Sequence, residues 1–332
     1  MAKLTKKRIA WWIIIIVVGS AVGLKIWKGK ECPGTKIPKE IFKAEEREKP
    51  YKQRFIAGEN QAEDKIAVIN IQGEITNSRW GYSYRRGMVD ELIEQLKQAE
   101  KDKNVKAIIL KINSPGGPVI DADILYNKIK EVAKKKIVVA LLDRIAASGG
   151  YYVACAAHKI VSHPLTLTGS IGVVMDYMNL QGLLEKKLGV EMGVIKSGPY
   201  KDIGSPYRSM NVSEKKILQE IVNAAHRRFV ANIAAGRKIS IEKLAPIADG
   251  RVYSGEQAKR LGLVDELGTQ DEAVELAKKL SGVEKVKVVE YYYRPNLLDY
   301  LFSKTSGDLK MKDVVSVSEP VLKYFWQPIL ER

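Results

Sequence analysis

The sequence contains little cysteine and little histidine, and both shortages narrow the chemistry open to it. Its two cysteines, Cys32 and Cys155, are too few for a disulfide framework and wrongly spaced for a zinc site. Cys155 is expected to be a small buried apolar residue. We expect neither a metal nor a cofactor.

The sequence also has fewer acidic than basic residues. Lys and Arg number 55 against 39 Asp and Glu, so the formal net charge is +16. The basic residues are scattered through helical segments, and no known nucleic-acid-binding motif accompanies them. A membrane surface explains the charge better, and no nucleic-acid partner is expected.

One long apolar run stands near the amino terminus. The stretch from Ile9 to Leu24 carries no charge, and Trp11 and Trp27 lie near its two ends as in an interfacial aromatic belt. The segment after it is bulky and basic, without the small residues of a signal-peptide cleavage site. We predict a transmembrane anchor over residues 9–27 that contacts the lipid bilayer.

The charges around this anchor predict its orientation. Residues 1–8 carry four cationic side chains and the amino terminus, against the three lysines Lys25, Lys28 and Lys30 on the other side. By the positive-inside rule we expect residues 1–8 in the cytoplasm and the body of the protein outside the cell membrane.

Composition divides the remaining chain. Residues 28–64 are rich in Lys, Glu and Pro and are expected to form a linker. Residues 65–283 alternate β-branched runs, such as Ala107–Ile112 and Ile137–Leu142, with amphipathic segments, which predicts an α/β domain. Residues 284–332 begin as a strand and form an aromatic, irregular C-terminal extension.

Two turns follow predicted strands at the place where α/β sheets bind ligands. One is Asn113–Gly117. The other contains Ser148, at a strand-to-helix junction where a serine nucleophile would stand. The N–H groups of Gly149 and of either Gly116 or Gly117 could then hold a developing oxyanion. The simpler readings are a helix N-cap for Ser148 and a plain turn for the first segment.

A serine nucleophile needs a base to accept its proton. The three histidines, His158, His163 and His226, form no convincing triad with Ser148, because they fall at a far helix end, in a loop and in a solvated helical position. A neutral lysine is the alternative, which requires burial away from water.

The loop Val194–Gly204 offers Lys196 and Lys201 as candidate bases. Lys196 is more simply a solvated lysine. A carboxylate beside a lysine favours its charged form, so Asp202 must point elsewhere if Lys201 is the base. After this loop a long amphipathic helix is expected, with Ser213 as its N-cap and an apolar side of Ile217, Leu218, Ile221, Val222, Ala225 and Phe229.

Several of these segments together resemble the SppA-type signal peptide peptidases. They are Asn113–Gly117, Ala147–Tyr151, Leu167–Gly172, Ser197–Asp202, Asp249–Gly255 and Leu261–Asp265, in this order along residues 65–280. The short amino-terminal anchor and the single domain resemble the half-length members. The resemblance implies a fold shared with Clp protease and the crotonases, built from repeated ββα units.

The resemblance also implies roles for particular residues. Ser148 is the expected nucleophile, Lys201 the general base, and Ser170 the hydroxyl that orients the lysine. The expected activity is hydrolysis of remnant signal peptides and other hydrophobic segments by a membrane-anchored serine endopeptidase. The resemblance further implies a ring-shaped homo-oligomer in which serine and lysine meet at a subunit interface.

Other functions remain open at this stage. The same paired N–H groups would suit a crotonase-like acyl-CoA enzyme, although the anchor and Lys201 argue against it. The chain could also be a protease that cuts membrane-organising proteins, or a membrane scaffold with a vestigial site. The simple reading of Ser170 is a buried hydroxyl bonded to the backbone.

Overall fold

The computed structural model describes residues 51–77, 87–292 and 322–325. The predicted anchor, residues 9–27, lies outside these ranges, as does most of the predicted linker. Within the described residues, no helix is both long and apolar enough to cross a membrane. The anchor and its orientation therefore stay predictions, as do the domain boundaries.

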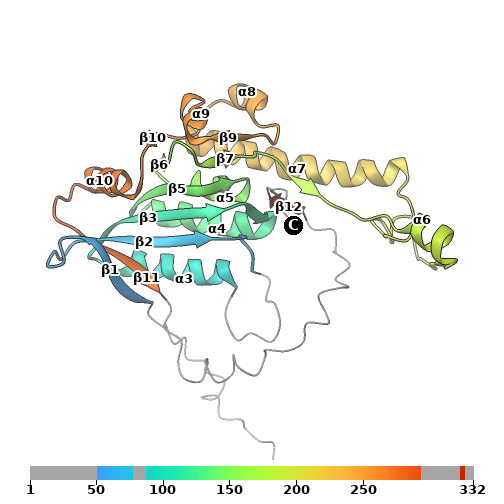
Figure 1. Ribbon diagram of the computed structural model, residues 1–332, viewed down its shortest axis with the longest axis horizontal. Coiled ribbons are helices and arrows are strands. Elements are labelled where there is room, and N and C mark those ends of the chain that lie inside the picture. Colours follow the sequence, from blue (N-terminus) through green and yellow to red (C-terminus); the bar gives the residue numbers. More distant parts are fainter. Residues whose placement is uncertain (1–50, 78–86, 293–321, 326–332) are drawn as a thin grey trace, which may run out of the picture. The chain divides into compact units, whose positions relative to one another are not determined.

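A large mixed sheet organises the described residues (Figure 1). Its strand order is β1 (Lys52–Gly58), β11 (Lys287–Tyr292), β2 (Lys65–Gln72), β3 (Val105–Ser114), β5 (Ile137–Ala147), β6 (Lys159–Ser162) and β10 (Glu266–Leu267). The pairs from β11 to β10 are parallel, and β1 is antiparallel to β11. The last residues of β5 pair with β7 (Leu167–Gly169), which pairs in turn with β9 (Val252–Ser254).

Helices cover both faces of this sheet. On one face lie α3 (Met88–Lys101), α4 (Val119–Ala133) and α5 (Gly149–Ala154), with the second half of α7 (Val212–Arg237) packed on α5; on the other lies α10 (Gln270–Ser281). Shorter elements are α6 (Gln181–Leu183), a π-helical turn (Leu184–Leu188), α8 (Ile241–Leu244), a 3-10 turn (Ala245–Ile247) and α9 (Gly255–Arg260). The sequence-based prediction of an α/β domain is confirmed.

The central strands are apolar throughout because both of their faces are buried. In β3, Ile108, Leu110 and Ile112 pack with the residues of α3, α4 and α5, whereas Ala107 and Ile109 pack with those of α10. Successive side chains of a strand point to opposite faces, so one continuous apolar run contributes to two cores.

A second, small sheet consists of β4 (Gly116–Pro118), β12 (Leu322–Phe325) and β8 (Val174–Met175), with β12 in the middle. Figure 1 shows β12 close to α4 and α5, which both contact it. A strand from the C-terminal extension therefore lies against the turn that follows β3.

Two segments differ from the sequence-based expectations. The predicted linker, residues 28–64, ends in strand β1, whose Ile56 and Ala57 pack against the core on the α10 side. The N-cap of α7 is Asn211 instead of Ser213. Asn211 accepts from the Glu214 N–H and Glu214 accepts from the Asn211 N–H, a capping box that a cap at Ser213 would forgo.

The apolar side expected for α7 is buried in only half of the helix. Phe229 is fully buried, whereas Ile217 and Ile221 are 36% and 44% exposed. Figure 1 shows the first half of α7 and α6 extending away from the sheet. The exposed half has an apolar side without a partner in the described part of the chain.

The second half of α7 packs closely on α5. A Cβ at Gly236 would lie 2.1 Å from the Cys155 carbonyl oxygen, so the two backbones approach as only glycine allows. Cys155 is buried, as expected, and burial raises the pKa of its thiol to about 12. Earlier in α7, Arg228 bonds Asp123 of α4, and Asn232 donates to Tyr152 of α5.

Replacing Gly236 by Ala tests this contact. Alanine is the better helix former by about 1 kcal/mol, but its Cβ meets backbone that must shift, which typically costs about 1–3 kcal/mol. We expect a lower free energy of unfolding by chemical denaturation. Gly182→Ala in α6, where a Cβ meets nothing within 4 Å, is the matched control and should not destabilise. Equal stability of both variants would contradict the close α5–α7 contact.

Candidate active site

Ser148 stands at the strand-to-helix junction in a conformation unusual for a serine. Its φ is 52° and ψ −115°, and the residue is 1% exposed. Ser148 does occupy the N-cap position of α5, as the simpler interpretation expects, but its side chain makes no capping hydrogen bond. A left-handed non-glycine residue costs of order 1–3 kcal/mol and is found where function needs a particular side-chain direction.

Ser170 lies beside Ser148. Ala147 of β5 pairs with Gly169 of β7, and the Ser148 N–H donates to the Gly169 carbonyl at 2.8 Å, so the two serines follow paired residues. Ser170 is also left-handed, with φ 49°, and 7% exposed. Its N–H donates to the Arg251 carbonyl, but among the described residues its hydroxyl has no hydrogen-bond partner.

The turn after β3 contains two candidate oxyanion donors, the N–H groups of Gly116 and Gly117, which differ in their hydrogen bonding. The Gly116 N–H donates to the Ser114 hydroxyl at 3.1 Å, and the Gly116 carbonyl accepts from the Ile75 N–H at 2.8 Å. Ser114 is fully buried. Because the Gly116 N–H is already bonded, Gly117 is the better candidate. Gly149 opens α5, and the first N–H groups of a helix have no acceptor within it.

Strand β12 runs along this turn. Its residues Lys323, Tyr324 and Phe325 pair with Pro118, Gly117 and Gly116, in that order. Antiparallel pairs alternate between those that exchange two hydrogen bonds and those that exchange none. The Gly117 pair is therefore of the other type than the Gly116 and Pro118 pairs on either side of it. Strand β12 thus runs directly along the residues that follow β3.

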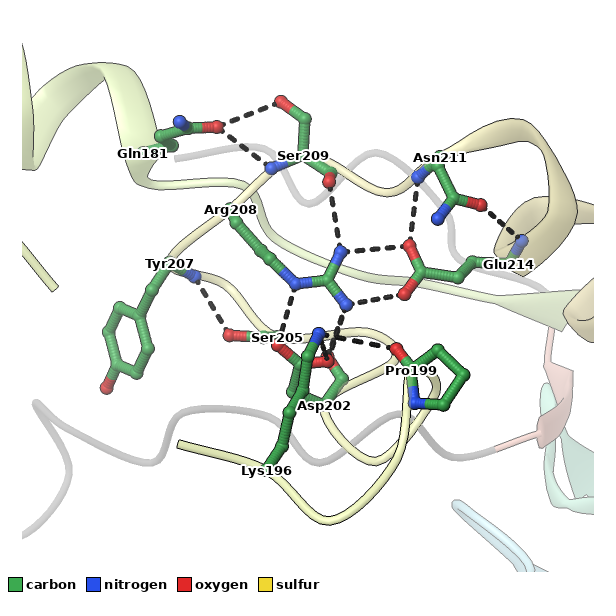
Figure 2. A network of polar contacts seen from close by, with 10 residues as sticks. All are labelled: Gln181, Lys196, Pro199, Asp202, Ser205, Tyr207, Arg208, Ser209, Asn211 and Glu214. Carbon is green, nitrogen blue, oxygen red and sulfur yellow. Dashed lines mark hydrogen bonds and ion pairs between the residues drawn. The ribbon is translucent and has the colours of Figure 1, made fainter. Parts of the chain in front are cut away.

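Lys201 lies in a polar loop that Figure 2 shows from close by. The guanidinium of Arg208 lies between two carboxylates, with Nε and Nη2 donating to Asp202 at 2.7 Å each and Nη1 donating to Glu214 at 2.9 Å. Lys196 also donates to Asp202, at 2.7 Å. Both oxygens of Asp202 thus accept hydrogen bonds from residues other than Lys201, and Lys196 is held in an ion pair.

The same contacts set the charge of both carboxylates. Hydrogen bonds from Arg208, and then from Lys196, hold the pKa of Asp202 well below its usual range. Arg208 and the Asn211 N–H lower the pKa of Glu214 to about 2. Both groups are therefore carboxylates at the pH of any ordinary assay.

Lys201 and Ser148 are not joined in one copy of the chain. Lys201 is exposed, and within the described ranges no hydrogen bond connects it with Ser148 or Ser170. The segment around it exposes large apolar side chains: Tyr177, Met178, Leu183, Leu188, Val190, Met192, Val194, Ile195, Tyr200, Tyr207 and Val212. A segment that exposes this many large apolar side chains is typical of an interface.

The histidines have structural partners. His158 and His163 each accept a backbone N–H, from Val138 and Leu165, and His226 bonds the Ala248 carbonyl. His226 is thus part-buried and bonded instead of simply solvated. No cluster of metal-ligating side chains occurs in the part of the chain that is described.

A cavity of about 520 Å³ lies next to His163, and its lining includes none of Ser148, Ser170 and Lys201. It is lined by parts of β3, β5 and the start of α10, including Lys111, Asp143, His163 and Thr269, and by none of the predicted catalytic residues. The candidate site therefore lies in the backbone geometry around Ser148 and not in this cavity.

The buried serine with positive φ thus stands at the carboxyl end of a parallel strand, in an α/β fold like that of Clp protease. The sequence matches the Clp protease family over residues 63–166 and Peptidase family S49 over residues 130–284. The chain belongs to peptidase family S49, and the resemblance to SppA-type peptidases is confirmed.

Relatives support this assignment over most of the chain. A provisionally named protease of Methanocaldococcus jannaschii is 46% identical over 70% of this chain and 76% of its own length. One of Synechocystis is 42% identical over 68% and 77%. A provisionally named signal peptide peptidase SppA of Enterococcus faecium is 36% identical over 70% and 68%.

Two residues near this site carry no sequence signal for their contacts. The sequence places Ser114 only in a turn, because nothing local shows that its hydroxyl accepts the Gly116 N–H. Arg208 carried no sequence signal, although the Asn211–Glu214 capping box beside it was readable.

Replacing Ser114 by Ala tests the assignment of the oxyanion donor. Removing an oxyanion donor outright typically costs about 2.7–4 kcal/mol of barrier, and misplacing one should cost less. We expect a kcat about tenfold lower with little change in KM, and partial rescue by Ser114→Thr. Ser162→Ala is the control, since Ser162 is equally buried but its hydroxyl bonds only the His163 carbonyl. An unchanged kcat for Ser114→Ala would contradict this role.

Proposed function

We propose that the chain is a membrane-anchored serine endopeptidase that acts through an acyl-enzyme, with Ser148 as nucleophile and Lys201 as general base. The observation that carries the proposal is the position of Ser148: buried, left-handed, beside Ser170 and next to the Gly117 turn. This backbone has no other evident use, because the Ser148 side chain does not cap its helix.

The proposed reaction uses few groups. Neutral Lys201 takes the Ser148 proton as Oγ attacks the scissile carbonyl, and the N–H groups of Gly149 and Gly117 stabilise the oxyanion. The lysine then gives the proton to the leaving amine, and water releases the acyl group. Ser170 orients the lysine amine through its free hydroxyl.

A second copy of the chain supplies the missing geometry. Lysine acts as a base only in its neutral form, which burial away from water favours, and Lys201 is exposed in a single copy. The exposed apolar side chains around it give another copy a surface to cover. We propose a ring-shaped homo-oligomer in which Lys201 of one copy serves Ser148 of the next.

The substrate is proposed to bind as an extended strand. Strand β12 shows that the space between β4 and β8 accepts an extended backbone paired on both sides, which is how peptides add to sheet edges. From the family resemblance, remnant signal peptides and other hydrophobic segments near the membrane are the proposed substrates, reached from an anchor at residues 9–27.

Mixing inactive variants tests the dyad and its placement. Ser148→Ala and Lys201→Ala should each lose peptide hydrolysis, because nucleophile and base are both indispensable. If the dyad forms between copies, dissociating and reassembling the two variants together should restore part of the activity. Cleavage of a synthetic signal peptide measures both effects.

The controls separate the parts of this proposal. Lys196→Ala should keep substantial activity, and loss there with retention in Lys201→Ala would refute the assignment of the base. Persistent labelling of Ser148→Ala by an acylating probe would show that another serine is the nucleophile. If both single variants are inactive and mixing them restores no activity, the serine and the lysine act within one copy.

Removing β12 tests the substrate site. If peptides bind between β4 and β8, they must displace residues 322–325. A chain that ends at residue 321 should show a lower KM for a synthetic peptide, with an unchanged kcat. A KM that stays the same or rises would show that substrate binds elsewhere or that β12 completes the site.

A further inference from the structure

Arg208 bonds two carboxylates from different parts of the chain. Asp202 directly follows the proposed base, and Glu214 belongs to the first turn of α7 (Figure 2). The side chains of Asp202 and Glu214 are only 11% and 1% exposed. An arginine guanidinium that donates hydrogen bonds to two carboxylates at once fixes the position of one relative to the other.

Glu214 is itself fixed by the helix. It accepts the Asn211 N–H, and its own N–H donates to the Asn211 side chain, each at 2.9 Å. The other end of α7 is tied to the core through Arg228 and Asp123. Arg208 therefore connects the loop of the proposed base to a helix that is anchored next to α5, the helix that begins after Ser148.

The charges around this loop are nearly balanced. Two cations, Lys196 and Arg208, bond Asp202, and Arg208 also bonds Glu214. From α6, the element beside the loop, neutral Gln181 contacts Ser209 and also bonds Glu185. No other charged side chain in the described residues forms an ion pair with these four.

The contacts of Asp202 bear on the proposed role of the neighbouring Lys201 as a base. A carboxylate within about 4–6 Å of an amine favours the charged amine, which cannot act as a base. Asp202 is adjacent to Lys201 in the chain, yet both of its oxygens are taken by Arg208, with Lys196 sharing one of them.

We propose that Arg208 is a positioning residue of the peptidase, which holds Asp202 away from Lys201 so that Lys201 can lose its proton at working pH. The inference rests on the proposed role of Lys201 as base. Arg208 touches neither the substrate nor the reacting atoms. It acts by occupying the carboxylate that would otherwise pair with the base.

The pH dependence of kcat/KM tests this role in the full chain. The rate should rise with pH as Lys201 loses its proton, because only the neutral amine is a base. In Arg208→Gln, the Asp202 oxygen that only Arg208 Nε bonds becomes available to Lys201, while Lys196 still bonds the other oxygen, and the rising limb should move to higher pH by about one to three pH units. At the upper plateau most of the activity should return.

A second substitution distinguishes charge from structure. In Arg208→Gln combined with Asp202→Asn, the carboxylate adjacent to Lys201 in the chain is gone, so the limb should move back toward that of the wild type. Arg208→Lys should show an intermediate position. Arg54→Gln, which removes an ion pair with Glu290 between β1 and β11, is the control and should leave the profile unchanged.

The alternative results are distinct. Equal loss of rate at every pH in Arg208→Gln, or a shift that persists in the double variant, would overturn the proposal. A readout without turnover is the pH dependence of Lys201 acetylation by acetic anhydride, followed by mass spectrometry. It should show the same alkaline shift, and no shift would overturn the proposal. Hydrolysis retained in Lys201→Ala would instead refute the proposed function.

Discussion

The parallel pairing of β3 with β5 is the constraint from which the candidate site follows. Its register shifts between the Ile112–Leu142 and Ser114–Ala146 pairs, so both strands deliver their next residues to one edge of the sheet. The Gly117 turn and the start of α5 meet there. A Cβ at Gly150 would lie 2.7 Å from the Ser114 carbonyl oxygen, so the contact leaves room for glycine alone.

Strain at this edge is held by burial and backbone bonding around it. Ser148 and Ser170 both take left-handed conformations that cost energy by themselves. The Gly169 carbonyl and the Arg251 carbonyl each accept one of their N–H groups, and the surrounding residues are almost all buried. The fully packed core of the sheet thus fixes the direction of two side chains that an isolated turn would not hold.

The segment that carries Lys201 is stabilised in a different way from the buried edge of the sheet. It contributes little to the core, exposes large apolar side chains, and owes its local geometry to polar contacts centred on Arg208. One copy of the chain therefore holds Ser148, the proposed nucleophile, in a buried turn and presents Lys201, the proposed base, on an exposed loop. This division is what an active site completed by association would require, since the rigid half needs no partner to fold and the exposed half needs one to be dry.

The sequence by itself determined the α/β class, the family and the turn positions, because buried parallel strands require continuous apolar runs and tight turns require glycine. Alternation and composition did not reveal β1 or the exposed half of α7, since both depend on what lies opposite them. Only the tertiary structure showed that the Gly116 N–H bonds the Ser114 hydroxyl and brought Arg208 to Asp202. Hydrogen-bond partners at these places come from distant or non-repeating positions, and a linear pattern carries no record of which donor reaches which acceptor.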